Sequence, residues 1–172
     1  MKFRKIIYCL LTFSIVTLSS CGPDNEDYAN QVLGEYNMKI TPYLTLNIDG
    51  TNIPSPNDAI NTTCSITANG DNGNVIIKID GVNGVVNEFV MSAVCSGLGM
   101  NIDESTYKGI MNMGELRTFN CDFVLNNPTT TISSSDILNW DSSVTGKCIT
   151  NISGLDMPCN VSGKLNFYAY SK

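Results

Sequence analysis

Apolar and polar residues alternate along most of this chain. In residues 36–48 the apolar side chains share one parity and the polar ones the other, a period of two that predicts a half-buried strand. Pro42 interrupts the run, so the strand is expected to bend or to lie at an edge there. Asp49-Gly50 then predicts a turn, and Pro54 and Pro56 predict a loop.

The same alternation recurs several times toward the C-terminus. It predicts strands at residues 60–68, 75–79, 89–95, 107–113, 119–125, 144–152 and 157–169. Residues 69–74 are rich in Asn, Asp and Gly. They indicate a hairpin turn rather than a calcium loop, because the carboxylate spacing that a calcium loop needs downstream is missing. Gly97 and Gly99 are expected to kink a strand that resumes on the opposite parity, as at a β-bulge.

Helical signals are scarce. Ser134, Ser135 and Asp136 before Ile137-Leu138 are typical of a helix cap, so one short helical turn is expected there. Trp140 follows, and we interpret it as a hydrophobic plug beneath that turn, with stacking on a ligand as the alternative.

Seven to nine strands joined by short turns predict an all-β fold. We expect an antiparallel meander β-barrel of about eight strands, with a sandwich as the alternative. Long strands favour the barrel, because closing the sheet removes exposed edges. Eight strands leave room inside for side chains or for one small ligand.

The last hairpin predicts a disulfide. A turn at Ser153-Gly154 places Cys148 opposite Cys159, although both could instead be small buried hydrophobes, since the five cysteines beyond residue 21 all lie on the apolar parity. The other three are Cys64, Cys95 and Cys121, so at least one thiol stays free. No Cys-x-x-Cys spacing occurs, so neither a thiolate zinc site nor a redox motif is indicated.

The first 20 residues differ from the rest of the chain. Lys2, Arg4 and Lys5 are followed by an apolar run, residues 6–16, that would span about 17 Å as a helix, well short of the ~30 Å hydrocarbon core. That length is typical of a signal peptide. We therefore expect a signal peptide at 1–20, an acidic flexible tether at 21–31 and a barrel domain at 32–172.

Charge and composition exclude several function classes. The chain has 10 basic and 16 acidic residues, and removal of the three basic residues in 1–20 leaves 7 − 16 = −9. This balance argues against nucleic acid as a partner. The chain has no histidine, which excludes Ser-His-Asp and Cys-His catalysis and histidine-bound zinc. We expect no catalytic residue, metal site or cofactor, and a function other than that of an enzyme; an inhibitor would leave no signature.

Leu18-Ser19-Ser20-Cys21 is similar to the lipobox of bacterial lipoproteins. The resemblance implies cleavage before Cys21, a diacylglycerol on its sulfur and an acyl chain such as palmitate on its amino group. Two or three such chains hold a protein in a membrane firmly, at ~0.8 kcal/mol per buried methylene. The acidic residues of 24–27 resemble the surface-export signal of Bacteroidetes lipoproteins, which implies a place on the cell outer membrane; a plain spacer is the alternative.

A second resemblance covers most of the chain beyond the tether. Leu33-Gly34-Glu35-Tyr36 resembles the Gly-x-Trp start of lipocalins, with Tyr in place of Trp. Residues 32–170, with the Asp49-Gly50 turn and a closing hairpin at 152–167, look like the calycin-like domain of Bacteroidetes lipoproteins. The resemblance implies a lipocalin-like barrel that holds a ligand.

Two functions remain open. In the first, the barrel binds a small apolar ligand; candidate lining residues are Tyr36, Met38, Ile40, Leu46, Met91, Phe123, Leu165 and Phe167, which could also simply fill the barrel. In the second, the outer face contacts a glycan or another protein. Tyr168 and Tyr170 share the polar parity of the last strand, where exposed aromatic rings can stack on sugars or protect a strand edge.

Overall fold

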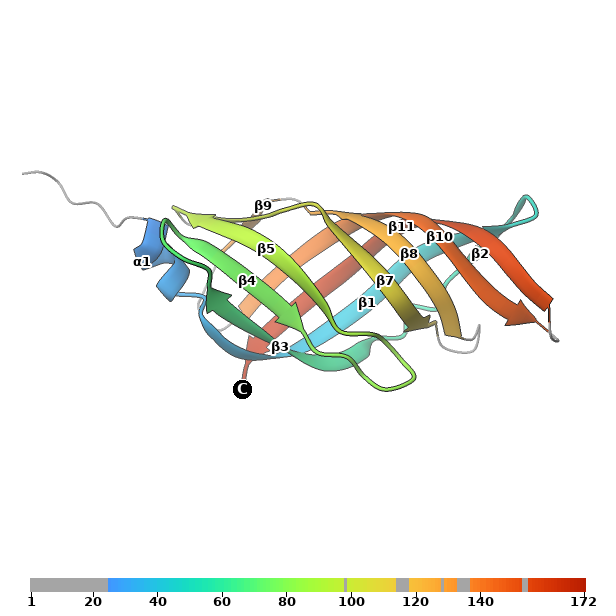
Figure 1. The fold of residues 1–172 in the computed structure, drawn as a ribbon, viewed down its shortest axis with the longest axis horizontal. Coiled ribbons are helices and arrows are strands. Elements are labelled where there is room, and N and C mark those ends of the chain that lie inside the picture. The colour runs from blue at the N-terminus through green and yellow to red at the C-terminus, as the bar shows by residue number, and fades with distance from the viewer. Residues whose placement is uncertain (1–24, 98, 114–117, 128, 133–136, 153–154) are drawn as a thin grey trace, which may run out of the picture.

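The protein folds as a curled antiparallel sheet with one short helix (Figure 1). The computed structural model describes residues 25–97, 99–113, 118–127, 129–132, 137–152 and 155–172. Within them the elements are α1 (Asn25–Asn30), β1 (Gly34–Ile48), β2 (Thr51–Pro54), β3 (Ile60–Ala68), β4 (Asn74–Ile79), β5 (Phe89–Ser96), β6 (Gly99–Ile102), β7 (Ser105–Asn112), β8 (Thr118–Asn126), β9 (Thr129–Thr131), β10 (Ile137–Ile152) and β11 (Leu155–Ser171). The all-β, barrel-like prediction is confirmed.

The described residues form eleven strands rather than about eight. Three of them, β2, β6 and β9, are only three or four residues long. β6 is the part of a predicted strand beyond the expected kink, and β2 and β9 are short segments outside the predicted strands that pair briefly with a neighbour. β2, for example, is the start of the predicted proline loop, and it pairs with β1 at Thr45–Ile48.

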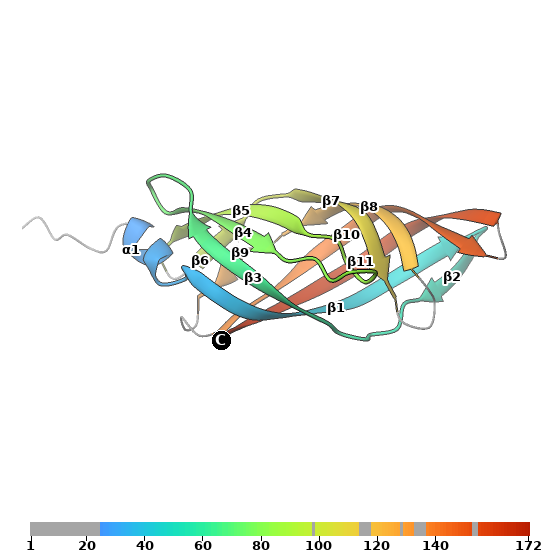
Figure 2. The ribbon, with the colours of Figure 1, turned by 60° about the horizontal axis from the view of Figure 1, so that its bottom comes forward.

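The strand order is β7-β8-β10-β11-β1-β3-β4-β5-β6-β9, with β2 also on β1. The first long strand, β1, therefore pairs with the last, β11, as Figure 2 shows. The two end strands of this order are joined indirectly. The backbone N–H of Asn112 in β7 donates to the carbonyl of Val85, which precedes β5 (2.6 Å). Thr130 Oγ1 in β9 donates to the carbonyl of Asn139 in β10 (2.7 Å). These bonds cross the seam, so the sheet curls back on itself.

Alternation along each strand produces the core. Along β5, β8 and most of β11, buried inward side chains alternate with mostly exposed outward ones. Each Å² of apolar surface that is withdrawn from water in this way stabilises the fold by about 25 cal/mol. Pro42 falls between the β1–β3 pairing, which ends at Ile40, and the β1–β2 pairing, which begins at Thr45. As expected, the proline lies where one side of its strand is locally an edge.

Part of the predicted tether is folded, which corrects the sequence interpretation. Asn25–Asn30 form helix α1, which packs against β4 and β5. Ala29 and the following Val32 are buried in the core. The helix forms because these side chains lie on one face and cover apolar surface at the end of the barrel, a tertiary contact that a count of charges does not reveal.

The helical turn predicted at residues 134–138 is wrong for Ile137 and Leu138, which lie in a strand. Ile137 and Leu138 begin β10 and lie opposite Tyr170 and Ala169 of β11, while residues 134–136 lie outside the described residues. A continuous partner strand offers hydrogen bonds to the backbone N–H and C=O groups all along β10. These bonds outweigh a local helix-capping signal. Trp140 continues the same strand and is buried.

The predicted bulge near Gly97 is a chain reversal. β5 and β6 pair antiparallel with Ser96 opposite Gly99, so the chain reverses direction between these two residues. Gly97 has φ of 56°, which glycine adopts readily. A bulge and a hairpin would both change the parity of the buried side chains after Gly97. Only the pairing of β6 with β5 distinguishes the two structures.

None of the helices in the described ranges has the length and apolar character needed to cross a membrane.

Candidate functional site

The eight candidate lining residues all point into the interior. Their exposed fractions are 0–3 %, and they belong to one continuous cluster of buried side chains. Tyr36 is satisfied there, because its hydroxyl donates to the carbonyl of Val32 (2.9 Å). The alternation of β1, β5, β8 and β11 thus brings residues from four strands together, as the sequence predicted for a barrel interior.

Aromatic rings cross this interior in contact with one another. Phe89 lies edge-on to Tyr107, with centroids 5.2 Å apart, and 6.1 Å from Phe167. Trp140 stacks on Phe167 at 4.9 Å.

Three hollows, of about 440, 410 and 270 Å³, are lined by described residues, and of the eight candidates only Met38 lines any of them. Ligand binding by all eight residues stays a prediction.

Trp140 carries a polar atom that this interior leaves unpaired. Its Nε1 is buried and has no hydrogen-bond partner among the described residues. A buried N–H without a partner costs about 1–3 kcal/mol, so such groups usually have an explanation outside the protein's own side chains.

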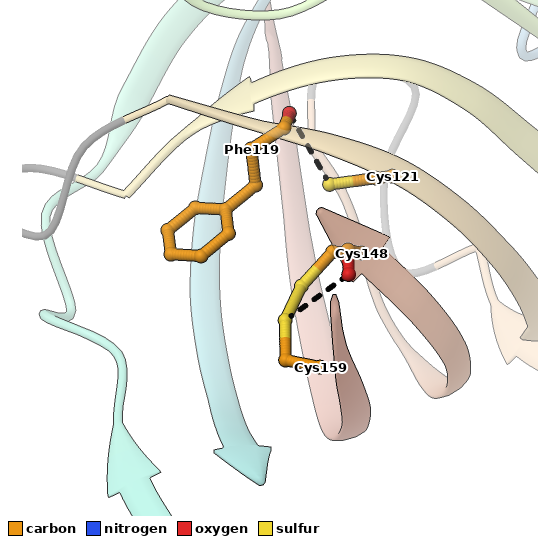
Figure 3. The surroundings of a disulfide bond; sticks show 4 residues. All are labelled: Phe119, Cys121, Cys148 and Cys159. Carbon is orange, nitrogen blue, oxygen red and sulfur yellow. Dashed lines mark hydrogen bonds between the residues drawn. A yellow bond between two sulfur atoms is a disulfide. The ribbon is translucent and has the colours of Figure 1, made fainter. Parts of the chain in front are cut away.

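Three of the cysteines form a row across the adjacent strands β8, β10 and β11. Cys148 and Cys159 are joined by a disulfide between β10 and β11, with Cα atoms 5.3 Å apart. On the other side of Cys148 lies Cys121 of β8, whose thiol donates to the carbonyl of Phe119 at 3.6 Å (Figure 3). Cys64, Cys95 and Cys121 are free and buried. Burial raises the pKa of Cys64 and of Cys121 to about 12, so neither thiol is a ready nucleophile.

Tyr168 and Tyr170 lie on the outer face of β11. Their ring centroids are 5.9 Å apart with planes inclined by 39°, and Tyr170 is 43 % exposed. The register places Tyr168 between Asn139 of β10 and Lys39 of β1. Tyr168 is therefore flanked by polar side chains on both sides, whereas Tyr170 lies between Ile137 of β10, which is 40 % exposed, and Asn37 of β1.

Hydrogen bonds hold the polar side chains next to the pair. Asn166 Nδ2 donates to Asn139 Oδ1 (2.8 Å) and to Asp141 Oδ1 (2.9 Å). Lys164 Nζ donates to Asp141 Oδ2 (2.9 Å). The bonds from Lys164 and Asn166 lower the pKa of Asp141, which keeps it ionised. We call Tyr168, Tyr170, Asn139, Asn166, Asp141 and Lys164 the tyrosine face.

A hollow of about 410 Å³ adjoins the tyrosine face at Tyr170. We call it the Asp80 hollow, and it is lined by Asn37, Met38, Asn61, Thr62, Thr63, Asp80, Gly81, Val82 and Tyr170. Sequence reasoning missed it, because its lining comes from β1, β3, β11 and the segment after β4. A weak signal was present in the polar parity of β3, where Asn61 and Thr63 are outward.

Cys21, the predicted lipidation site, lies outside the described residues. In the part of the chain that the structure describes, no three His, Cys, Asp or Glu side chains gather as metal ligands would.

No family model, curated protein or solved structure matches this chain.

Proposed function

We propose that this protein is a lipid-anchored, non-enzymatic binding protein of the outer membrane whose tyrosine face binds glycan at the cell surface. The observation that carries the proposal is the pair of neighbouring outward rings, Tyr168 and Tyr170, set among hydrogen-bonded amides and a carboxylate. Sugars offer apolar C–H faces and many hydroxyl groups, and rings beside fixed polar groups satisfy both.

The packing of the interior supports the outer face over the barrel lumen. The candidate lining residues are buried and belong to one cluster of packed side chains. The aromatic pair, by contrast, is partly open to solvent on a polar surface. Fixed side chains also favour binding, because less rotamer entropy is lost when the ligand arrives.

The anchor is proposed from the lipobox-like residues 18–21 and the resemblance to bacterial lipoproteins. Four residues, 21–24, lead from the acylated cysteine to helix α1 and can reach at most about 14 Å. The end of the barrel that carries α1 would then face the membrane. The β1–β2 turn, the end of β10 and the start of β11 lie at the opposite end in Figures 1 and 2 and would point away from it.

The glycan proposal is tested with the processed, acylated protein in detergent on a glycan array. We expect specific binding that a Tyr168→Ser/Tyr170→Ser variant loses at least tenfold. Ile149→Ser is the matched control: Ile149 is 45 % exposed on the outer face of β10, eight residues along that strand from Asp141, or roughly 26 Å away. Absence of binding by the unaltered protein, or equal loss in both variants, would refute the proposal.

The anchor has its own test. Growth with an alkyne-bearing palmitate should label the unaltered protein, and Cys21→Ser should abolish the label while the protein remains in the precursor form. A label that survives in Cys21→Ser would rule out the anchor at this residue without affecting the glycan proposal.

One observation favours a second candidate, an apolar ligand with a hydrogen-bond acceptor inside the barrel. Such an acceptor would satisfy the buried Trp140 Nε1. Native mass spectrometry of the purified protein should then find a co-purifying mass that Trp140→Phe, which lacks the N–H, releases. Spectra that contain only the mass of the acylated protein would remove this candidate.

A further inference from the structure

The Asp80 hollow and the tyrosine face form one continuous surface. Tyr170 belongs to both. It lies opposite Asn37 of β1, and Asn37 in turn lies opposite Thr63 of β3. From β11 to β3 is two strand spacings, roughly 10 Å. A ligand stacked on the tyrosine pair can therefore reach the hollow without leaving the sheet face.

The carboxyl group of Asp80 is held in place by its neighbours. Thr63 Oγ1 donates to Asp80 Oδ2, and the Asp80 backbone N–H donates to the carbonyl of Thr63 (2.9 Å). Thr62 Oγ1 donates to the carbonyl of Asp80 (2.7 Å). These three bonds fix the residue directly after β4. A carboxylate accepts about four hydrogen bonds, so Asp80 retains acceptor capacity for ligand hydroxyls.

The rest of the lining suits a neutral, hydroxyl-rich ligand. The amides of Asn37 and Asn61 supply donors and acceptors, and Val82 supplies apolar contact. No Lys or Arg lines the hollow, as far as the described residues show, and the nearby Lys78 is paired with Glu88 at 2.9 Å. An anionic sugar in the hollow would therefore place its charge against Asp80, while Lys39, which lies opposite Asn61 and Tyr168 on the same outer face, is outside the lining.

We propose that the Asp80 hollow is a specificity subsite that binds one uncharged sugar residue of the glycan and rejects acidic sugars. Asp80 accepts hydrogen bonds from the sugar hydroxyls while Tyr170 contacts the ring beside it. The volume of the Asp80 hollow, about 410 Å³, lies within the range of roughly 300–1,000 Å³ that small-ligand sites have. This proposal rests on the proposed glycan-binding function, and it assigns to the Asp80 hollow the selection of neutral over acidic sugars.

The test uses an array of matched oligosaccharides, each neutral glycan paired with a counterpart that carries a hexuronate in place of one neutral sugar, followed by calorimetry on the best pair. The unaltered protein should prefer the neutral member. Asp80→Asn keeps the shape of the side chain and removes its charge. It should weaken neutral binding about ten- to a hundredfold, the usual effect of losing charged hydrogen bonds, and abolish the preference against hexuronate.

Two further variants make the test decisive. Asp122→Asn removes an exposed carboxylate of β8, one paired with Lys108 of β7, and should change neither affinity nor preference. Asn61→Asp adds a charge to the hollow at an exposed position and should strengthen the rejection of hexuronate, which keeps the test informative if Asp80→Asn does not fold. Unchanged preference in both lining variants, with binding still lost in Tyr168→Ser/Tyr170→Ser, would refute the subsite and leave the glycan function standing. Absence of any glycan binding by the unaltered protein would refute both.

Discussion

Trp140 and Phe167 lie directly opposite each other on β10 and β11, and their rings stack with centroids 4.9 Å apart and planes 13° from parallel. Both side chains point inward and are buried. The stack joins the two longest strands at the point where the outer side of the same strands carries the tyrosine face. Stability of the interior and order of the candidate site are therefore linked through one pair of strands.

Phe167→Ala should lower the free energy of unfolding by about 3–5 kcal/mol, because it removes a fully buried ring and leaves a cavity beneath Trp140. Urea unfolding followed by the fluorescence of Trp140, the single tryptophan of the chain, measures the loss. Tyr170→Ala, three residues further along β11 and outward, serves as the control and should cost less than about 1 kcal/mol. Equal losses in the two variants would contradict the packing described for the interior.

Cys159→Ser should produce a new disulfide between Cys121 and Cys148. Cys148 loses its partner on β11, and Cys121 is the residue opposite it on β8. Directly opposite residues of antiparallel strands have Cα atoms about 4.5–5.5 Å apart, within the range that a disulfide bridges. Peptide mapping under non-reducing conditions should find the 121–148 linkage, and the double variant Cys121→Ser/Cys159→Ser should lack it. A free Cys148 in the oxidised single variant would contradict the strand register.

Cys64 and Cys121 should resist alkylation in the folded protein at pH 8. Burial raises the pKa of each thiol to about 12, so the reactive thiolate is a minute fraction at pH 8 and grows only as the pH rises toward that value. Iodoacetamide labelling followed by mass spectrometry should detect little modification of these two cysteines until urea unfolds the chain. Rapid labelling of either residue in the native state would show that its strand opens readily.

Gly163→Ala should destabilise the fold by about 1–3 kcal/mol. Gly163 has φ of 139°, and a Cβ there would lie 2.3 Å from the carbonyl oxygen of Tyr43 on the neighbouring strand. Relief of the clash would require β1 and β11 to separate. Ser162→Ala, the exposed neighbour, is the control and should be close to neutral. Thermal unfolding compares the two, and a Gly163→Ala midpoint equal to that of Ser162→Ala would contradict the close approach of the strands.

Local pattern predicted the strands and their faces, and with them the residues that meet inside the barrel. Tyr36, Met91 and Phe123 are far apart in the sequence, yet the parity of each strand alone placed them inward. The Cys148–Cys159 pairing was also accessible, because a hairpin is local and its turn sets the register. The polar parity of Tyr168 and Tyr170 likewise predicted that they face outward.

Other features depended on contacts between distant segments. Helix α1 forms where acidic residues suggested a tether, since its apolar face covers the end of the barrel. Ile137 and Leu138 follow their partner strand instead of a capping signal. In both places a local signal was compatible with two structures, and a non-local partner selected one. At Gly97 the parity change fitted both a bulge and a hairpin, and the pairing of β6 with β5 decided between them.

By itself, then, the alternation of this sequence determined an all-β chain with one apolar and one polar side to each strand, because a side chain's face follows from its parity alone. Only the tertiary structure decided how the strands are ordered, that β11 lies beside β1, and that Tyr170, Asn37 and Thr63 therefore line up toward Asp80. The Asp80 hollow exists because four segments remote in sequence converge, and the period of a single strand carries no information about which strand lies next to it.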